Sequence, residues 1–176
     1  MSLPDIPGYR IETLIGKGAC GTVYTARHDS GSLVAVKILD PDCTNADLLC
    51  NRVNRLYRTT PPRATVPLIA HSLEKEPFLL IGGLMADRVV QGVGERFVPR
   101  TLQLQLGDYL GKRGSWMLIR RLAQILAEFH RRRVAHGNLK PGNIFLDSDS
   151  EVLLSDYGQG LMPGLSKLSY TDALLY

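Results

Sequence analysis

The residues best suited to chemistry lie in one octapeptide and in a short segment that follows it. The octapeptide His136–Asn143 reads HGNLKPGN and carries an imidazole, two amides and an ammonium group. Asp156 follows within the tetrapeptide SDYG, and its carboxylate is a hard oxygen ligand of the kind that magnesium prefers. The octapeptide itself contains no carboxylate, and the amide of Asn138 cannot accept a proton as a carboxylate does.

A glycine-rich segment near the start of the chain could approach a phosphate closely. Gly16–Gly21 reads GKGACG, a GxGxxG pattern that by itself fits any glycine-rich turn. It follows the alternating segment Arg10–Ile15, and the β-branched and aromatic residues of Thr22–Ala26 favour a second strand after it. The order strand, glycine turn, strand argues against a dinucleotide-binding loop, which should open a helix.

These segments resemble the motifs of protein kinases. The octapeptide is similar to the catalytic loop HRDLKPxN, and six of its eight positions keep the family residue or fall at the variable site. The glycine segment resembles the loop that covers the ATP phosphates, where missing side chains let backbone N–H groups approach the oxygens. Lys37, in the sequence VAVK, resembles the phosphate-contacting lysine, and SDYG resembles the DFG motif with Tyr in place of Phe. The chain is similar to the Ser/Thr type, and its opening IPGYRI resembles bacterial domains.

The resemblance implies an α+β, bilobal kinase-like fold whose helical C-lobe stops before the APE motif. Residues 1–84 would form the N-lobe, 85–105 the hinge and an inserted loop, and 106–176 a partial C-lobe. The N-lobe would hold a five-stranded antiparallel sheet and the helix αC, predicted at Ala46–Arg58 from its apolar stripe. The strands are predicted at Arg10–Ile15, Thr22–Ala26, Leu33–Leu39, Val66–Ser72 and Phe78–Leu84. Met85–Arg100 shows no strong pattern and is predicted to be a loop.

At the boundary with the C-lobe, the alternation TLQLQL at Thr101–Leu106 predicts a short strand, and a small helix is predicted at Gly107–Arg113. Ser115 is predicted to cap a long helix at Trp116–Arg133, and two short strands would follow at Ile144–Leu146 and Glu151–Leu154. Apolar residues of the long helix fall at helical spacing and should face a core: Leu118, Leu122, Ile125, Leu126 and Phe129. The usual partner of this face, later in the family's C-lobe, is missing. We therefore expect a protein partner or the remainder of the chain to cover it.

The resemblance also implies a nucleotide site and assigns its residues. Asn138 stands where the family has the Asp that takes the proton from the substrate hydroxyl, and Lys140 would neutralise the transferring phosphate. Asn143 and Asp156 would bind Mg²⁺, and His136 would be a packed scaffold residue. ATP would be contacted by Gly16, Gly18, Gly21, Val23, Ala35, Lys37, Ile81, Gly82 and Leu84. In this set Ile81 would guard the back of the adenine pocket, and Gly82–Leu84 would form the hinge.

Three departures from the family lie on the catalytic side of this site. Asn138 replaces the Asp, Gly137 replaces an Arg, and no Asp or Glu occurs between Leu48 and Leu73, where the αC Glu should lie. The nearest matches to that Glu are Asn51 or Arg52, and Asp47 is the only local substitute.

These losses predict an ATP-binding, catalytically impaired pseudokinase with a regulatory or scaffolding role. Two alternatives stay open: a weakly active Ser/Thr kinase that transfers the γ-phosphate to protein hydroxyls, and an interaction module that binds no nucleotide.

Composition limits the remaining functional classes. The 176 residues are 44% hydrophobic with a net charge of +4, which is typical of a soluble globular protein. The cysteines, Cys20, Cys43 and Cys50, are odd in number and show no CxxC spacing. Their pattern indicates neither a disulfide framework nor a zinc site, and it favours a reducing compartment, the cytoplasm. No apolar run approaches the ~20 residues of a membrane span. No basic patch interleaved with aromatics indicates nucleic-acid binding.

Overall fold

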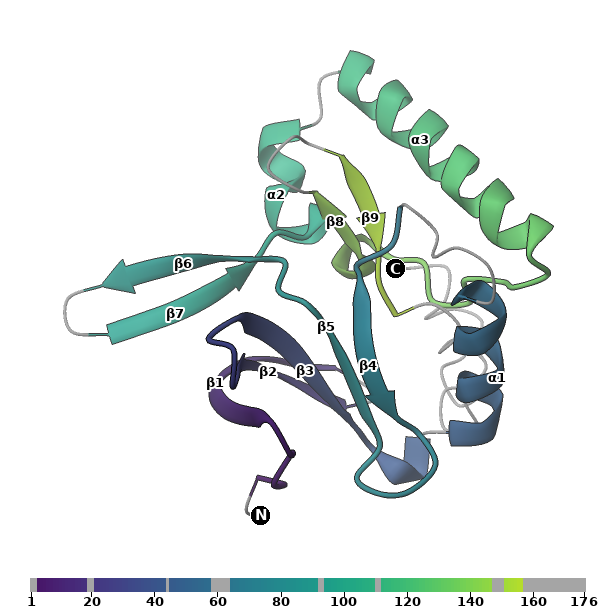
Figure 1. Ribbon diagram of the computed structural model, residues 1–176. Coiled ribbons are helices and arrows are strands. Elements are labelled where there is room, and N and C mark those ends of the chain that lie inside the picture. The colour runs from purple at the N-terminus through teal and green to yellow at the C-terminus, as the bar shows by residue number, and fades with distance from the viewer. Residues whose placement is uncertain are drawn as a thin grey trace.

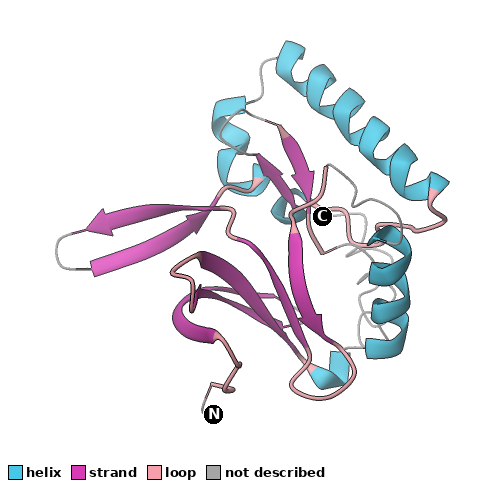
Figure 2. Cartoon of the chain, viewed as in Figure 1, coloured by secondary structure: helices cyan, strands magenta, loops and turns pink. Residues whose placement is uncertain are grey.

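The computed structural model describes residues 3–18, 21–43, 45–57, 64–91, 94–109, 112–146 and 151–156. A strand-rich N-lobe and a C-lobe with helices are joined by an extended segment (Figures 1 and 2). No helix in these residues is long and apolar enough to cross a membrane.

The N-lobe is built on the predicted five-stranded antiparallel sheet. Its strands lie in the order β1-β2-β3-β5-β4. One face of the sheet packs an apolar cluster around Ala26, Val36 and Ile81, and the opposite face carries Lys37 toward the C-lobe. The five strands of this sheet are β1 Tyr9–Gly18, β2 Gly21–His28, β3 Leu33–Leu39, β4 Leu68–Ser72 and β5 Leu79–Gly83.

Helix α1, Ala46–Tyr57, follows the one-turn 3₁₀ helix Pro41–Cys43 and flanks β4 (Figure 1). Asn45 caps it, because its Oδ1 accepts a hydrogen bond of 2.9 Å from the backbone N–H of Leu48. Leu49 and Val53 are one helical turn apart and both are buried in the main core. The predicted helix is therefore confirmed over its described residues.

The prediction of a loop at Met85–Arg100 is wrong. This segment forms a hairpin of β6, Ala86–Gln91, and β7, Gly94–Pro99, that projects from the body in Figure 1. The β-branched pair Val89 and Val90 and the pair Phe97 and Val98 favour strands on either side of a Gly-containing turn. Phe97 is only 8% exposed, and β7 contacts β1, so the hairpin is anchored to the N-lobe.

The predicted strand at Thr101–Leu106 is also wrong. Thr101 forms a single bridge to Phe145, and helix α2 then runs over Leu102–Tyr109. Leu and Gln are good helix formers, and the alternating leucines do not share one buried face: Leu102 is buried, whereas Leu104 is 60% exposed. The small helix thus begins earlier than the predicted Gly107–Arg113.

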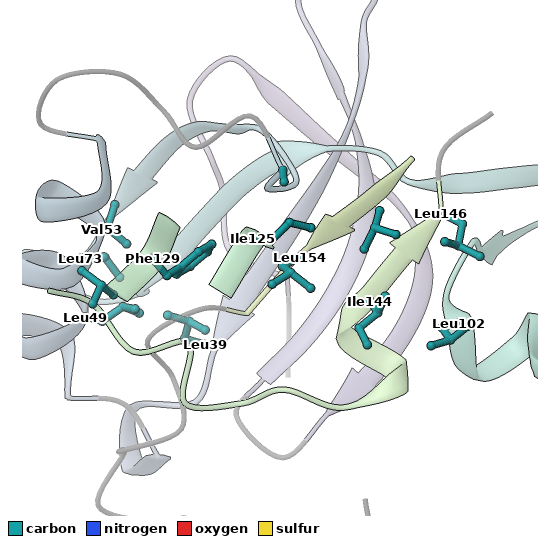
Figure 3. Packing of buried hydrophobic residues seen from close by; sticks show 13 residues of the cluster. Leu39, Leu49, Val53, Leu73, Leu102, Ile125, Phe129, Ile144, Leu146 and Leu154 are labelled. Atoms are coloured by element: carbon teal, nitrogen blue, oxygen red, sulfur yellow. The ribbon is translucent and has the colours of Figure 1, made fainter. Parts of the chain in front are cut away.

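The long helix α3 covers Lys112–Arg131, so it starts before Ser115, which does not cap it. Its predicted core face is confirmed: Ile125 and Phe129 are buried in one cluster with Leu49, Val53 and Leu154 (Figure 3). Three further leucines of this face, Leu118, Leu122 and Leu126, are partly buried against the same core. The face thus packs on the core of this chain, and the expectation that a protein partner or the remainder of the chain also covers it stays a prediction. The exposed apolar side chains of α3 are others, namely Trp116, Met117 and Ile119.

Backbone hydrogen bonds hold a small hairpin of the C-lobe at the boundary between the two lobes. The predicted strands β8, Ile144–Leu146, and β9, Val152–Leu154, pair antiparallel. Leu154 donates to the Ala64 carbonyl at 2.9 Å and accepts from the Val66 N–H at 3.0 Å, while Leu146 donates to the Arg100 carbonyl at 3.0 Å. The hairpin is thus held by the N-lobe on one side and by the exit of β7 on the other. These contacts fix the residues at its two ends.

Candidate nucleotide-binding cleft

A cleft of about 480 Å³ lies between the lobes, a size typical of small-molecule sites. The N-lobe sheet, the hinge, the catalytic loop and the segment after β9 all contribute to its walls. The structure brings together many of the predicted ligands in this lining: Gly16, Val23, Ala35, Lys37, Gly82, Leu84, Asn143 and Asp156.

The central contact of the cleft is an ion pair. Lys37 lies opposite Val23 and Leu80 in the sheet register, which directs its side chain to the cleft face. Its Nζ is 2.7 Å from Oδ2 of Asp156, with side-chain exposures of 13% and 26%. A charge-assisted hydrogen bond of this length is among the stronger polar contacts in proteins. The sheet and the catalytic-loop region are thereby joined at the predicted site.

Helix α1 presents apolar side chains to the cleft where the family has its Glu. Leu49 and Val53 line the cleft and are buried. Asn51, one of the two nearest matches to the missing Glu, is exposed, and the side chain of Arg52 lies outside the described residues. Asp47 is exposed in the first turn of the helix. An acid that does contact Lys37 is Asp156, which comes from the other lobe.

Asn143 and Asp156 are placed by the backbone of the C-lobe hairpin. The Ser155 N–H donates to the Asn143 carbonyl at 3.0 Å, and Asp156 adopts a left-handed φ of 55°. Asn143 is 5% exposed, and its Nδ2 donates to the Asn138 carbonyl at 2.7 Å. A carbonyl can only accept, so the amide orientation is determined and Oδ1 remains to serve as an oxygen ligand.

The two predicted catalytic residues lie beside the cleft. Asn138 and Lys140 are half-buried and are not among the residues that line it. Asn138 is nevertheless held by its backbone, whose N–H donates to Nδ1 of His136 at 3.3 Å and whose carbonyl binds Asn143. Gly137 has a φ of 74°, where an arginine side chain would add backbone strain.

The glycines of the GxGxxG segment serve different purposes. A Cβ on Gly21, whose φ is 143°, would lie 2.2 Å from the Ile38 carbonyl oxygen, so the fold requires glycine there. Among the described residues, a Cβ on Gly16 would meet no atom within 4 Å, and a Cβ on Gly18 would meet only the Gly21 oxygen at 3.8 Å. Since Gly16 lines the cleft, the free space beside it belongs to the cleft. Cys20 lies outside the described residues.

Ile81, which was predicted to guard the back of the adenine pocket, is not among the residues that line the cleft. Ile81 lies opposite Val36 and is buried in the cluster on the far face of the sheet. Its neighbour Leu80 lies opposite Lys37 and lines the cleft. A shift of one residue moves a strand side chain to the other face, and β5 is apolar on both faces, so alternation gave no signal. The register against Lys37 would have identified Leu80.

Packing confines one predicted residue of the wall, and other parts of the wall were not predicted. Gly82 is confined by packing, because a Cβ there would lie 2.8 Å from the Pro67 carbonyl oxygen. The base of the β6–β7 hairpin contributes Ala86 and Pro99, and α2 contributes Gln103 and Leu104. The hairpin could have been found from its paired β-branched and aromatic residues.

His136 is buried, as predicted for a scaffold residue, and its ring centroid is 5.8 Å from that of Phe129. Burial lowers the pKa of His136 below its ordinary 6.5, although the Asp156 carboxylate and the Ser155 backbone act to raise it. Nδ1 accepts the Asn138 N–H, so the neutral ring carries its proton on Nε2.

The depressed pKa of His136 predicts a loss of stability in acid. Below about pH 6.5 the unfolded chain takes up a proton that the folded chain does not, so the free energy of unfolding falls as the pH falls. His136→Gln should therefore show a smaller decrease in urea-denaturation stability between pH 7.5 and pH 5.5 than the parent, whereas the change His71→Gln at an exposed position should not. An equal decrease in the parent and in His136→Gln would contradict this assignment.

Comparison with known proteins agrees with this architecture. Residues 9–172 match the family model for protein tyrosine and serine/threonine kinases. CBL-interacting protein kinase 21 of Oryza sativa subsp. japonica is 28% identical over 160 residues, covering 88% of this chain and 28% of the relative. Serine/threonine-protein kinase greatwall of Xenopus tropicalis is 26% identical over 176 residues, with coverages of 97% and 18%.

Mitogen-activated protein kinase KSS1 of Saccharomyces cerevisiae is 29% identical over 162 residues, covering 88% of this chain and 42% of the relative. The chain thus spans less than half the length of each of these three relatives. With the family model matched over most of its residues, and with this fold, the chain belongs to the protein tyrosine and serine/threonine kinase family.

Proposed function

We propose that this chain binds ATP in the interlobe cleft and acts as a catalytically impaired pseudokinase with a regulatory or scaffolding role. The observation that carries the proposal is the contact of 2.7 Å between Lys37 and Asp156, two residues 119 positions apart that meet in the cleft. Fold-forming contacts alone do not require a lysine and an aspartate to face a cleft.

The cleft has the chemistry that a nucleoside triphosphate needs. Gly16 leaves space against which phosphate oxygens can pack, and the Lys37 ammonium faces the same space. Apolar side chains, including Val23, Ala35 and Leu80, give the base a matching surface. Asn143 and Asp156 supply the oxygens that would hold Mg²⁺, which neutralises phosphate charge when bound.

The site departs from the family at the residues that would accept a proton and orient Lys37. Asn138 has an amide at the position of the family's proton-accepting carboxylate, and loss of a general base typically removes ~10²–10⁴ in rate. The αC acid is replaced by the apolar surface of Leu49 and Val53. A weakly active Ser/Thr kinase is the second candidate. It is favoured by the assembled Lys37, Asn143 and Asp156, because phosphoryl transfer rests largely on positioning and electrostatics.

ATP binding should depend on Lys37. Isothermal titration calorimetry of the parent should detect binding, and Lys37→Met should weaken it by about tenfold or more, because a charge-assisted hydrogen bond to phosphate is lost. The control Lys75→Met removes an exposed lysine between β4 and β5 and should bind as the parent does. No binding by the parent at millimolar ATP would support the third function, an interaction module that binds no nucleotide. Equal affinities of the two lysine variants would place the ligand elsewhere.

Phosphoryl transfer should be limited by Asn138. The parent should incorporate radioactive phosphate from ATP at least about 10²-fold more slowly than Asn138→Asp, which restores a carboxylate at this position. Asn138→Ala should behave as the parent does, because neither side chain accepts a proton. A parent rate comparable to that of Asn138→Asp would refute the pseudokinase proposal and support the weakly active kinase.

A further inference from the structure

The end of β1 that borders the cleft receives limited support from its own sheet. β1 lies at the edge of the five-stranded sheet, next to β2. Its pairing with β2 is irregular between Ile11 and Leu14 and again between Leu14 and Gly16. Irregularities of this kind bend a strand and interrupt its ladder of hydrogen bonds. They lie at the start of the segment formed by residues 15–17, which lines the cleft beside the phosphate-facing lysine.

The β6–β7 hairpin reaches β1 from outside this sheet. Strand β7 contacts β1, and the opposed residues Ala86 and Pro99 at the base of the hairpin line the cleft. The register of the hairpin is regular, so Phe97 lies on the same face as Pro99. Phe97 is only 8% exposed, whereas Val98 on the opposite face is half-buried. The hairpin thus carries a buried aromatic ring on the face that continues outward from the cleft.

The base of the hairpin is anchored in the C-lobe. The Arg100 N–H donates to the Met85 carbonyl at 3.0 Å, which closes the hairpin at its base. The Arg100 carbonyl accepts from the Leu146 N–H in β8, also at 3.0 Å. The hairpin therefore connects β8, which follows the catalytic loop, with β1, which carries the glycine segment.

The contact between the hairpin and β1 depends on Phe97. Of the hairpin side chains that the structure describes, Phe97 alone is buried. An isolated two-stranded hairpin is at best marginally stable in water, and a buried aromatic side chain removes about 150–250 Å² of surface from water. The hairpin thus gains its stability against the N-lobe, and the edge strand β1 gains a second support in return.

We propose that the β6–β7 hairpin supports strand β1 for nucleotide binding, and that Phe97 is a positioning residue of the site. The inference rests on the proposed function, since it assigns the hairpin a role in ATP binding. Held between β8 and β1, the hairpin keeps residues 15–17 in the place where they close on the ligand. Without this support β1 spends less time in the binding position, and the apparent affinity falls by the same fraction.

The test is isothermal titration calorimetry with ATP at a temperature where each variant is folded. Phe97→Ala should weaken binding by about fivefold or more. Phe97→Leu keeps a large apolar side chain and Val98→Ala truncates the opposite face, so both should bind within about twofold of the parent. A residue that only stabilises the fold would lower the unfolding temperature and leave the affinity of the folded chain unchanged.

Equal affinities of the parent and Phe97→Ala would overturn the inference while leaving ATP binding established. Equal weakening by Phe97→Ala and Val98→Ala would also overturn it, because the effect would then not belong to the buried face. Absence of binding by the parent would instead overturn the proposed function, and the inference with it.

Hydrogen exchange on the parent chain tests the inference even if Phe97→Ala does not fold. Saturating ATP should slow amide exchange at residues 95–98 of β7 as well as in β1, because the two strands are ordered together. Protection that is confined to β1, or absent from both strands, would overturn the inference.

Discussion

The ion pair between Lys37 and Asp156 is the constraint on which the rest of the cleft depends. Both side chains are largely removed from water, so strand β3 and the segment after β9 cannot move apart without breaking a charge-assisted contact of 2.7 Å. The contact spans both lobes, because Lys37 belongs to the N-lobe sheet and Asp156 follows the C-lobe hairpin. The walls of the cleft are therefore fixed relative to each other at the point where phosphate would bind.

The proposal that this chain binds ATP but transfers phosphate slowly is supported by the backbone around this pair. The β8–β9 hairpin is bonded to the N-lobe through Leu154 and to the exit of β7 through Leu146, which places Asn143 and Asp156 at the cleft. The hairpin and its backbone hydrogen bonds do not require a proton-accepting carboxylate at position 138. Asn138 keeps its backbone contacts to His136 and Asn143, so the loop retains its shape while its side chain has lost the carboxylate. An amide in place of the family's carboxylate at position 138 does not disturb the geometry that would hold a nucleotide.

The sequence predicted those site residues that sit at fixed spacing within strongly patterned segments. Lys37, alone in an apolar strand, and Asp156, at the end of a short hairpin, both lie at the cleft. Prediction failed where local pattern was ambiguous. In β5 both faces are apolar, so alternation could not separate Ile81 from Leu80, and only pairing with β3 does so. At Thr101–Leu106 the alternation predicted a strand, but the helix propensity of Leu and Gln prevails and the segment enters α2. The β6–β7 hairpin was missed because the family resemblance supplied no counterpart for this segment.

The most direct measurement of the central claim is a double-mutant cycle on ATP affinity in EDTA, with Lys37→Met, Asp156→Asn and the double variant. If the two residues act as one unit, Asp156→Asn weakens binding by about fivefold or more in the parent but by less than about twofold in Lys37→Met. If Asp156→Asn instead changes the affinity by the same factor in both backgrounds, the residues act independently and the account is contradicted.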